Sequence, residues 1–460
     1  MGAIITLSLL AILILYLGLY KAQKALLPVS LLGLLGALVF EGLLWNKVPE
    51  AQFSGMVLFD RFSVLFSIIC IVLTALILVL SKEFFESLKI HVAEYYALVI
   101  CSLIGAISIT SYHNFAMLFI GIEIMSVAVY ILSGIRKKDV YSNEAALKYF
   151  IMGAFSTGFL LFGIALMYGA TGSFELSVLK DYVLSNSTSI SPLFYGGISL
   201  LLIGLCFKVG AAPFHFWTPD VYDGAPTMVT TYMSTVVKVA SFAAFFRLFD
   251  FVLAPLGDYW TPVLLTIIVI TLFVGNITAL VQSSFKRMLA YSSVSHAGYM
   301  LFAILAVGPL ANNGLVMYSI AYSLASIIGF GGLYIVKRDT GGETFDAFNG
   351  LGKKNPVFAA LLTVAMLSLA GIPFTAGFIG KFLMFNAAMS QYHVVLLVLA
   401  AVNAIIGVYY YLRVVVHMYF KNVEDEVAVQ VSPVHMAIFA IAFIGTLILG
   451  VYPDLVIGLM

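Results

Sequence analysis

The amino-acid sequence predicts an all-α polytopic membrane protein of about fourteen transmembrane helices. Of the 460 residues, 62% are hydrophobic and only 10% are charged, whereas a soluble domain carries about a quarter charged residues. No globular core of this size buries so much apolar surface, so the excess must face lipid. Apolar runs of about 20 residues, the length that crosses a hydrocarbon core, recur along the chain with short connections between them.

Composition also excludes several classes of function. The net charge of +1 is not the strongly basic charge that is typical of nucleic-acid-binding proteins. Cys70, Cys101 and Cys206 lie inside apolar runs and form no CxxC pair, so they indicate neither an iron–sulfur site nor a disulfide, and we expect small buried hydrophobic residues. No glycine-rich phosphate loop follows a strand, and no soluble face is available for nicotinamide or flavin. We therefore expect no cofactor, no metal and no redox chemistry in this chain alone.

The apolar runs predict the helices one by one. The first run, residues 3–20, has no basic region before it and has Lys21 and Lys24 after it. A secretory signal shows the reverse order, so we expect a retained first helix. The remaining predicted spans are 26–44, 58–80, 93–111, 114–134, 145–170, 194–216, 225–248, 260–281, 288–308, 313–336, 356–386, 394–419 and 434–456.

Basic residues predict the orientation. Connections after even-numbered helices carry little beyond Lys47 and Lys180. Because lysine and arginine accumulate on the cytoplasmic side, the basic odd-numbered connections are predicted to be cytoplasmic, and both termini to lie on the outer side. The basic residues of the odd-numbered connections are Lys21, Lys24, Lys82, Lys89, Arg136, Lys137, Lys138, Lys286, Arg287, Lys337, Arg338, Lys353 and Lys354.

Two predicted spans are interrupted near their middle. The seventh contains Gly210 and Pro213, and the twelfth contains Gly371 and Pro373, each proline being followed by phenylalanine. Proline removes a backbone donor, and the freed carbonyls are tolerated in lipid only beside protein or a water-filled cavity. Five helices separate the breaks, so they cross the membrane in opposite directions, which favours inverted repeats over two unrelated kinks. The predicted division is 1–92 for helices 1–3, 93–248 for the first repeat (helices 4–8), 259–420 for the second repeat (helices 9–13) and 421–460 for helix 14.

Four ionisable residues fall inside apolar runs. Glu123 lies midway along the fifth span, Lys208 just before the first break, Lys238 midway along the eighth span, and Lys381 just after the second break. An ionised group at the bilayer centre costs roughly 2.5–3.5 kcal/mol. Burial and a movable partner shift the proton affinity of a carboxylate and of an amine in opposite directions. The four residues therefore predict a proton path, with structural ion pairs as the alternative.

Other polar residues are weaker candidates. His296, in the tenth span, would titrate near neutral pH and is either a proton relay or a satisfied core histidine. Lys148 is either a relay or, one turn after a glutamate, a stabilising pair at a helix entrance. His215 lies beside the first break, where freed backbone groups would anchor it. Asp220 and Asp223 are expected as turn and helix-entry residues. Belt or packing positions are expected for Tyr409, Tyr410 and Tyr411.

The sequence motifs around these residues resemble those of a known protein family. Residues 207–226 read Phe-Lys-Val-Gly-Ala-Ala-Pro-Phe-His-Phe-Trp-Thr-Pro-Asp-Val-Tyr-Asp-Gly-Ala-Pro and resemble the signature of the antiporter-like subunits of respiratory NADH:quinone oxidoreductase, complex I. Residues 144–150, 289–299 and 369–382 match the same family. These motifs look like those of the subunit N (subunit 14) group, whereas the other antiporter-like subunits and the Mrp antiporter subunits have variants of the same motifs. The resemblance covers about residues 58 to 420; Met125-Ser126 and Pro373-Phe374 depart from it.

The resemblance implies a proton channel of two inverted half-channels joined by a buried polar axis. It implies that NADH, FMN, iron–sulfur clusters and quinone belong to partner subunits, and that the partners are the other membrane subunits of complex I, including other antiporter-like subunits, in a bacterial inner membrane. It assigns proton transfer to Glu123, Lys208, Lys238 and Lys381, and an accessory relay to Lys148, His215 and His296.

The sequence therefore predicts a non-redox, proton-translocating subunit of an enzyme, driven by quinone reduction in its partners. Lys208 is expected to pair with Glu123, so that breaking the pair sends a proton along Lys238 and His296 to Lys381, which releases it on the outer side. Two alternatives remain open at this point. One is an Mrp-type sodium/proton antiporter subunit, and the other is a membrane scaffold that docks partners without transport.

Overall fold

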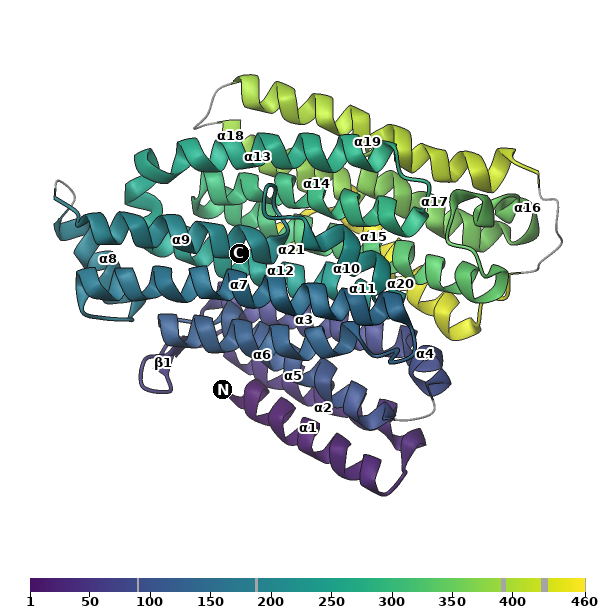
Figure 1. Cartoon of the computed structure of the whole chain (residues 1–460), viewed down its shortest axis with the longest axis horizontal. Coiled ribbons are helices and arrows are strands. Elements are labelled where there is room, and N and C mark those ends of the chain that lie inside the picture. Colours follow the sequence, from purple (N-terminus) through teal and green to yellow (C-terminus); the bar gives the residue numbers. More distant parts are fainter. Residues whose placement is uncertain (89–90, 187–188, 390–393, 423–428, 460) are drawn as a thin grey trace. The chain divides into compact units, whose positions relative to one another are not determined.

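The computed structural model describes residues 1–88, 91–186, 189–389, 394–422 and 429–459, and Lys89 lies outside them. The predicted fold class is confirmed, because the chain is an all-α polytopic membrane protein (Figure 1). In the described ranges, 12 helical segments are long and apolar enough to cross a membrane. These segments are α1 (Gly2–Leu19), α2 (Gln23–Leu44), α3 (Arg61–Leu80), α5 (Val92–Thr110), α6 (Phe115–Ser133), α7 (Val140–Thr171), α9 (Pro192–Val209), the run Thr227–Leu280, α14 (Phe285–Ala306), α15 (Gly308–Thr340), α19 (Val394–Phe420) and α20 (Pro433–Val451).

The predicted count of spans differs from these 12 segments for two reasons. Thr227–Leu280 is one run of 54 residues, more than twice the roughly 20 that one crossing needs, and it covers the predicted eighth and ninth spans. The predicted twelfth span is divided between two shorter helices, α17 (Pro356–Ala370) and α18 (Ala376–Met389). The long run consists of α11 (Thr227–Tyr232), the π-helical turn η1 (Met233–Val237), α12 (Lys238–Leu248), η2 (Phe249–Leu253), η3 (Ala254–Leu256) and α13 (Gly257–Leu280).

Short elements that the sequence did not predict lie between the spans. Two strands, β1 (Ala51–Gln52) and β2 (Val57–Leu58), pair antiparallel in the connection after α2. The short helices are α4 (Lys82–Ser87), α8 (Leu176–Ser185), α10 (Trp217–Gly224), η4 (Phe345–Phe348), α16 (Leu351–Lys354) and α21 (Asp454–Ile457).

Contacts between Cα atoms divide the chain into two compact units. The first unit comprises residues 1–209 and 236–263, and the second comprises 210–235 and 264–460. The division falls at the first predicted break, between α9 and Gly210, whose φ of 74° only glycine adopts readily. The predicted division into inverted repeats is a different partition of the chain, and it remains a prediction.

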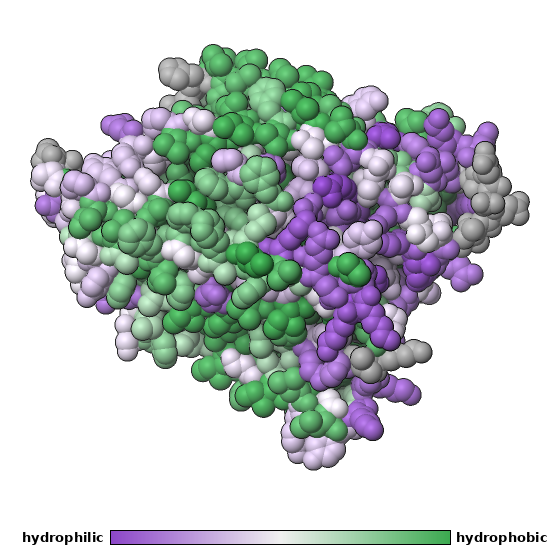
Figure 2. All heavy atoms as spheres, in the orientation of Figure 1, coloured by the Kyte–Doolittle hydropathy of each residue, from purple (hydrophilic) through white to green (hydrophobic). Residues whose placement is uncertain are grey.

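Within each unit, helices differ in how much of their surface they expose. In the first unit α1 packs on α2 and α5, and α7 packs on α9, yet only 28% of the spanning window of α1 is buried. In the second unit 94% of the window of α14 is buried. Exposed leucine, isoleucine and phenylalanine side chains on the outer helices give the apolar surface that covers much of the face in Figure 2. These are the burial patterns of lipid-facing and enclosed helices.

A partly buried ion pair joins three elements of the first unit. Arg247 on α12 donates from Nη2 to Asp60 Oδ1 at 2.6 Å and from Nε to the carbonyl of Thr110, the last residue of α5, at 3.1 Å. Asp60 also caps α3, because its Oδ1 accepts from the backbone nitrogen of Ser63 at 2.8 Å. One carboxylate therefore orients the start of α3 and neutralises an arginine that is 7% exposed.

A second ion cluster contains contacts that the sequence did not predict. Asp220 and Asp223 were expected as turn and helix-entry residues, and Asp220 does lie in the first turn of α10; Lys286 and Arg287 were expected in a basic connection. Arg287 contacts Asp220 at 3.1 Å and Asp223 at 3.4 Å. Lys286 is buried and donates to the carbonyls of Asp223 and Ala225, both at 2.6 Å. The start of α14 thus holds α10 in place, since charged side chains in a membrane protein pair with one another or with backbone carbonyls.

The Arg247 pair predicts a selective effect on stability. Asp60→Asn preserves the cap of α3, because asparagine caps as well as aspartate, but leaves the arginine without its charge partner. We expect a loss of roughly 2 kcal/mol, because the Asp60 carboxylate is partly exposed, measured as a lower melting temperature of the intact complex in detergent. The matched control is Glu94→Gln, which breaks the exposed pair with His91 and should cost less than about 1 kcal/mol. Equal shifts in the two variants would contradict a structural role for the partly buried pair.

Candidate functional site

Lys208 lies at the end of α9, directly before the first break, and its side chain is 7% exposed. Its Nζ donates to Ser126 Oγ at 2.8 Å and to Tyr130 OH at 3.4 Å, both on α6. The ammonium also lies 5.8 Å from the centre of the Tyr130 ring, a cation–π distance. Neutral hydroxyl groups therefore hold this lysine.

Glu123 lies one helical turn before Ser126 on the same helix. It is half-buried, and its Oε1 has no hydrogen-bond partner among the described residues. The carboxylate is close enough to Lys208 for an electrostatic interaction. In the part of the chain that the structure describes, no ion pair of 4.0 Å or less joins the two side chains. The two groups are therefore neighbours without direct contact.

Lys238 is the first residue of α12 and is 3% exposed. It directly follows the π-helical turn η1, an irregularity that occurs frequently at functional sites. In the first unit α12 packs on α3, α5 and α9. The first unit thus holds three of the ionisable residues that the sequence predicted, namely Glu123, Lys208 and Lys238.

The second break ends α17 in a Schellman motif. Gly371 adopts a φ of 84°, and its backbone nitrogen donates to the carbonyls of Leu367 and Ser368, while that of Ile372 donates to Leu367. Pro373 has no N–H and so cannot donate to the carbonyl of residue 369, the i−4 position of a continuous helix. The motif therefore leaves the carbonyls of residues 369 and 370 without helical donors.

Lys381 supplies the missing donors. It lies on α18, is 7% exposed, and its Nζ donates to the carbonyls of Leu369 at 3.0 Å and Ala370 at 2.9 Å. The C-terminal end of a helix carries a partial negative charge, so this position stabilises an ammonium group. The ammonium also lies 4.8 Å from the centre of the Tyr299 ring. Carbonyls and an aromatic face, all uncharged, surround the cation.

His296 on α14 is buried between two tyrosines. Its Nδ1 lies 2.7 Å from Tyr318 OH on α15, and its Nε2 lies 2.9 Å from Tyr411 OH on α19. Tyr411 also contacts the hydroxyl of Ser292. A neutral imidazole has one donor and one acceptor nitrogen, and hydroxyl groups satisfy both. His296 is therefore a satisfied core histidine that also belongs to a chain of hydroxyl groups.

One aromatic ring lies between the two titratable groups of the second unit. The ring of Tyr299 faces the Lys381 ammonium, and its centre lies 6.2 Å from that of His296. Gly380 brings α18 against Tyr318, since a Cβ at this glycine would lie 2.6 Å from the tyrosine ring. The backbone of α18 therefore lies directly against the residue that binds His296.

The remaining predicted residues have different surroundings. His215 lies in the turn between α9 and α10, is 6% exposed, and its Nδ1 has no hydrogen-bond partner within the described ranges. Lys148 forms an ion pair with Glu144 at 2.8 Å, and the two side chains are 40% and 52% exposed. This is the arrangement of the helix-entrance pair that the sequence left open.

Sequence reasoning missed the neutral partners of the charged groups. Ser126 was noted only as a departure from the family pattern, and Tyr411 was expected in packing or at the interface. The structure instead places them in contact with Lys208 and His296. Polar residues at helical spacing from a predicted site residue, such as Ser126 three residues after Glu123, were the signal available.

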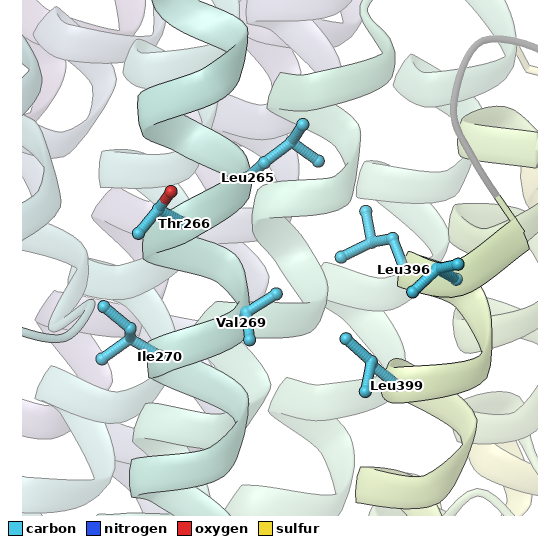
Figure 3. A pocket seen from close by; sticks show the side chains of 7 residues that line it. Leu265, Thr266, Val269, Ile270, Leu396 and Leu399 are labelled. Atoms are coloured by element: carbon cyan, nitrogen blue, oxygen red, sulfur yellow. The ribbon is translucent and has the colours of Figure 1, made fainter.

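An apolar groove lies elsewhere in the second unit. It has a volume of about 400 Å³ and lies between α13 and α19. Figure 3 shows Val269 of α13 and Leu396 and Leu399 of α19 pointing toward this space. Among the described residues, Thr266 is the one polar residue that lines the groove and no ionisable side chain lines it, so we do not include the groove in the candidate site. The described residues contain no cluster of three or more His, Cys, Asp or Glu that could hold a metal ion.

The chain matches a known protein family over the region that contains the candidate site. Residues 113–407 match the family model described as NADH:quinone oxidoreductase/Mrp antiporter, transmembrane. The chain belongs to this family. The matched residues extend from the start of α6 into α19 and so include the surroundings of both breaks.

Two relatives show which group of the family this chain resembles. The chain is 39% identical to the NADH-quinone oxidoreductase subunit N of Cytophaga hutchinsonii, with 99% of both chains covered. It is 38% identical to the subunit N of Flavobacterium psychrophilum, with 100% of both covered. These relatives confirm the resemblance to the subunit N group.

Solved structures of family members have the same fold. A chain of respiratory complex I from Thermus thermophilus matches with a TM-score of 0.86 and 33% identity, covering 99% of this chain and 98% of that one. A chain of the Mrp complex from a Dietzia species also gives a TM-score of 0.86, with 100% of this chain and 95% of that one covered, but at 19% identity. The second match shows the fold alone.

The position of Lys381 predicts a non-additive effect. A Cβ at Gly371 would lie 2.9 Å from Lys381 Cδ and 3.1 Å from Nζ, so Gly371→Ala should displace the ammonium from its carbonyls. Gly341, with a φ of 74° and nothing within 4 Å of its Cβ position, is the matched control. We expect about 1 kcal/mol of lost stability for Gly341→Ala and roughly 2 kcal/mol more for Gly371→Ala, measured by thermal unfolding. The excess should vanish in a Lys381→Ala background; an excess that persisted there would contradict the contact.

Proposed function

We propose that the chain is a proton-translocating, non-redox subunit of NADH:quinone oxidoreductase. The observation that carries this proposal is the nature of the partners of Lys208 and Lys381. Both are buried, and both hydrogen-bond only neutral oxygens in the interactions that the structure records. Ionisable residues within membrane spans mark proton and ion pathways, whereas Lys286, which also binds backbone carbonyls, lies at the start of its helix.

Neutral partners permit a lysine to lose and regain a proton without leaving a polar group unsatisfied. A neutral amine keeps two N–H groups, which match the carbonyls of Leu369 and Ala370 at Lys381. At Lys208, a neutral amine accepts a hydrogen bond from the Ser126 or Tyr130 hydroxyl, because hydroxyl groups donate as well as accept. Both protonation states therefore fit each site.

Glu123 is the group that we assign to control the first lysine. Its unpartnered oxygen lies one turn from Ser126, so a small movement would bring the carboxylate to the ammonium and stabilise the charged form. Withdrawal of the carboxylate would release the proton. In this proposal Lys238 receives the proton, and the His296 hydroxyl network passes it to Lys381, which releases it on the outer side. Lys148 and His215 serve as accessory relay groups.

The energy for this cycle comes, in the proposal, from quinone reduction in partner subunits that hold NADH, FMN, iron–sulfur clusters and quinone. The full-length similarity to subunit N relatives supports this assignment. The partners are other membrane subunits of complex I, including antiporter-like ones, in a bacterial inner membrane with both chain termini on the outer side.

The central prediction concerns Lys208 and Glu123. Lys208→Ala and Glu123→Ala should each lower proton pumping by at least about tenfold, because the first removes the proton carrier and the second the group that controls it. Pumping is measured as acidification of inverted vesicles, beside the rate of quinone reduction and the amount of assembled complex. Lys47→Ala, at an exposed lysine, is the control and should behave as the parent.

The alternatives give different outcomes. Full pumping in both variants would refute the pair as the control element. Loss of assembly with unchanged pumping per complex, after neutralising Lys208, Lys238 and Lys381 together, would support a scaffold. Transport that requires sodium and proceeds without quinone reduction would support an Mrp-type antiporter.

The His296 network gives a separate prediction. Tyr411→Phe removes the hydroxyl between His296 and Ser292 while keeping the ring, so pumping should fall by about 10²-fold, the lower end of the range that positioned acid–base groups contribute. Tyr409→Phe, at the 65% exposed tyrosine on the same helix, should have no effect in the same vesicle assay. Equal pumping in the two variants would remove Tyr411 from the path.

A further inference from the structure

A buried acid lies outside the proposed axis. Glu41 is on α2, its exposed fraction is 0%, and neither Oε1 nor Oε2 has a hydrogen-bond partner in the described residues. It ends the buried stripe of α2, whose other members are Leu26, Ser30, Leu34 and Ala37. A carboxyl group on the packed face of a membrane helix, with both oxygens unsatisfied, requires an explanation.

The helices that pack on α2 offer no charged partner within their spans. They are α1, α3 and α5. In the described sequence α1 has no charged side chain, α3 has only Arg61 and α5 has only Glu94, and both of these are exposed. Because Glu41 is wholly enclosed by its own chain, a neighbouring subunit cannot reach it to supply a donor.

The start of α1 is the nearest source of positive charge. Gly2 lies against Phe40, since a Cβ at this glycine would lie 2.5 Å from the phenylalanine ring. The Met1 amine donates to Gln52 Oε1 at 3.3 Å and interacts electrostatically with Glu41. Burial lowers the pKa of this amine, and the Glu41 carboxyl opposes the shift. Figure 1 shows the N-terminus near β1, at the end of α1 where this site lies.

The absence of donors decides the state of the acid. A buried ionised carboxylate without hydrogen bonds is strongly unfavourable, and the helix terminus of α1 supplies only a partial charge. Taking up a proton removes most of that unfavourable free energy, because the group becomes neutral.

We propose that Glu41 is a proton-binding site separate from the Glu123–Lys381 axis, a carboxylic acid that holds its proton at neutral pH where α2 packs against α1, α3 and α5. Its ligand is a proton. The site lies at the end of α2 that faces the predicted outer side of the membrane.

Infrared difference spectroscopy tests the protonation state in the native complex, because no reagent has to reach the enclosed side chain. A protonated carboxylic acid has a carbonyl stretching band that a carboxylate lacks. At neutral pH, the spectrum of the parent complex minus that of the Glu41→Gln variant should contain this band. The matched control, Glu50→Gln at an exposed glutamate, should remove only carboxylate bands. A Glu41→Gln difference spectrum with carboxylate bands and no protonated-acid band would overturn the proposal.

Thermal stability gives an independent measurement that does not use pumping. Glu41→Gln replaces a protonated acid with a neutral group of the same shape, so the melting temperature of the complex should be unchanged. If Glu41 were ionised and paired with the Met1 amine, the same variant would remove the counter-charge of that half-buried amine and lower the melting temperature. A lower melting temperature would therefore refute the protonated state, whatever the outcome of the pumping assays.

Discussion

The hydrogen bonds that Lys381 donates to the carbonyls of Leu369 and Ala370 are the interaction on which the candidate site depends. A backbone group without a partner in the hydrocarbon region costs several kcal/mol, so a helix interrupted by Pro373 survives there only if another donor replaces the lost N–H. Lys381 is that donor. The same two bonds fix the ammonium beside the ring of Tyr299. The backbone break therefore positions the charged group as well as requiring it.

The buried lysines beside the two breaks have different hydrogen-bond partners. Lys381 follows its break and binds carbonyls that the break frees, whereas Lys208 precedes its break and binds side-chain hydroxyls of another helix. Ser126, the closer of these partners, lies at a position where the sequence resemblance predicted a departure from the family motif. Its hydroxyl group, like that of Tyr130, preserves the ability of the amine to exist in either protonation state.

Local sequence signals predicted much of the fold and part of the site. Long apolar runs identified the spans, and glycine with proline identified both breaks, because these depend on neighbouring residues. The partners of the charged groups did not follow, since they are distant in sequence. Arg247 and Asp60 are 187 residues apart, and His296 and Tyr411 are 115 apart. Glu41 was missed because it lies near the end of an apolar run, where an acid is normally solvated, and only the packing of α1, α3 and α5 against it shows that it is enclosed.

The Schellman motif at the end of α17 also affects which ions this region accepts. Carbonyl groups at the C-terminal ends of interrupted membrane helices are typical ligands for sodium. Here the carbonyls of Leu367 and Ser368 accept backbone N–H groups, and those of Leu369 and Ala370 accept the lysine. An alkali cation entering this place would have to displace an ammonium that is covalently tethered to the chain. All four carbonyls at this end of the broken helix therefore accept hydrogen bonds from donors of the chain itself.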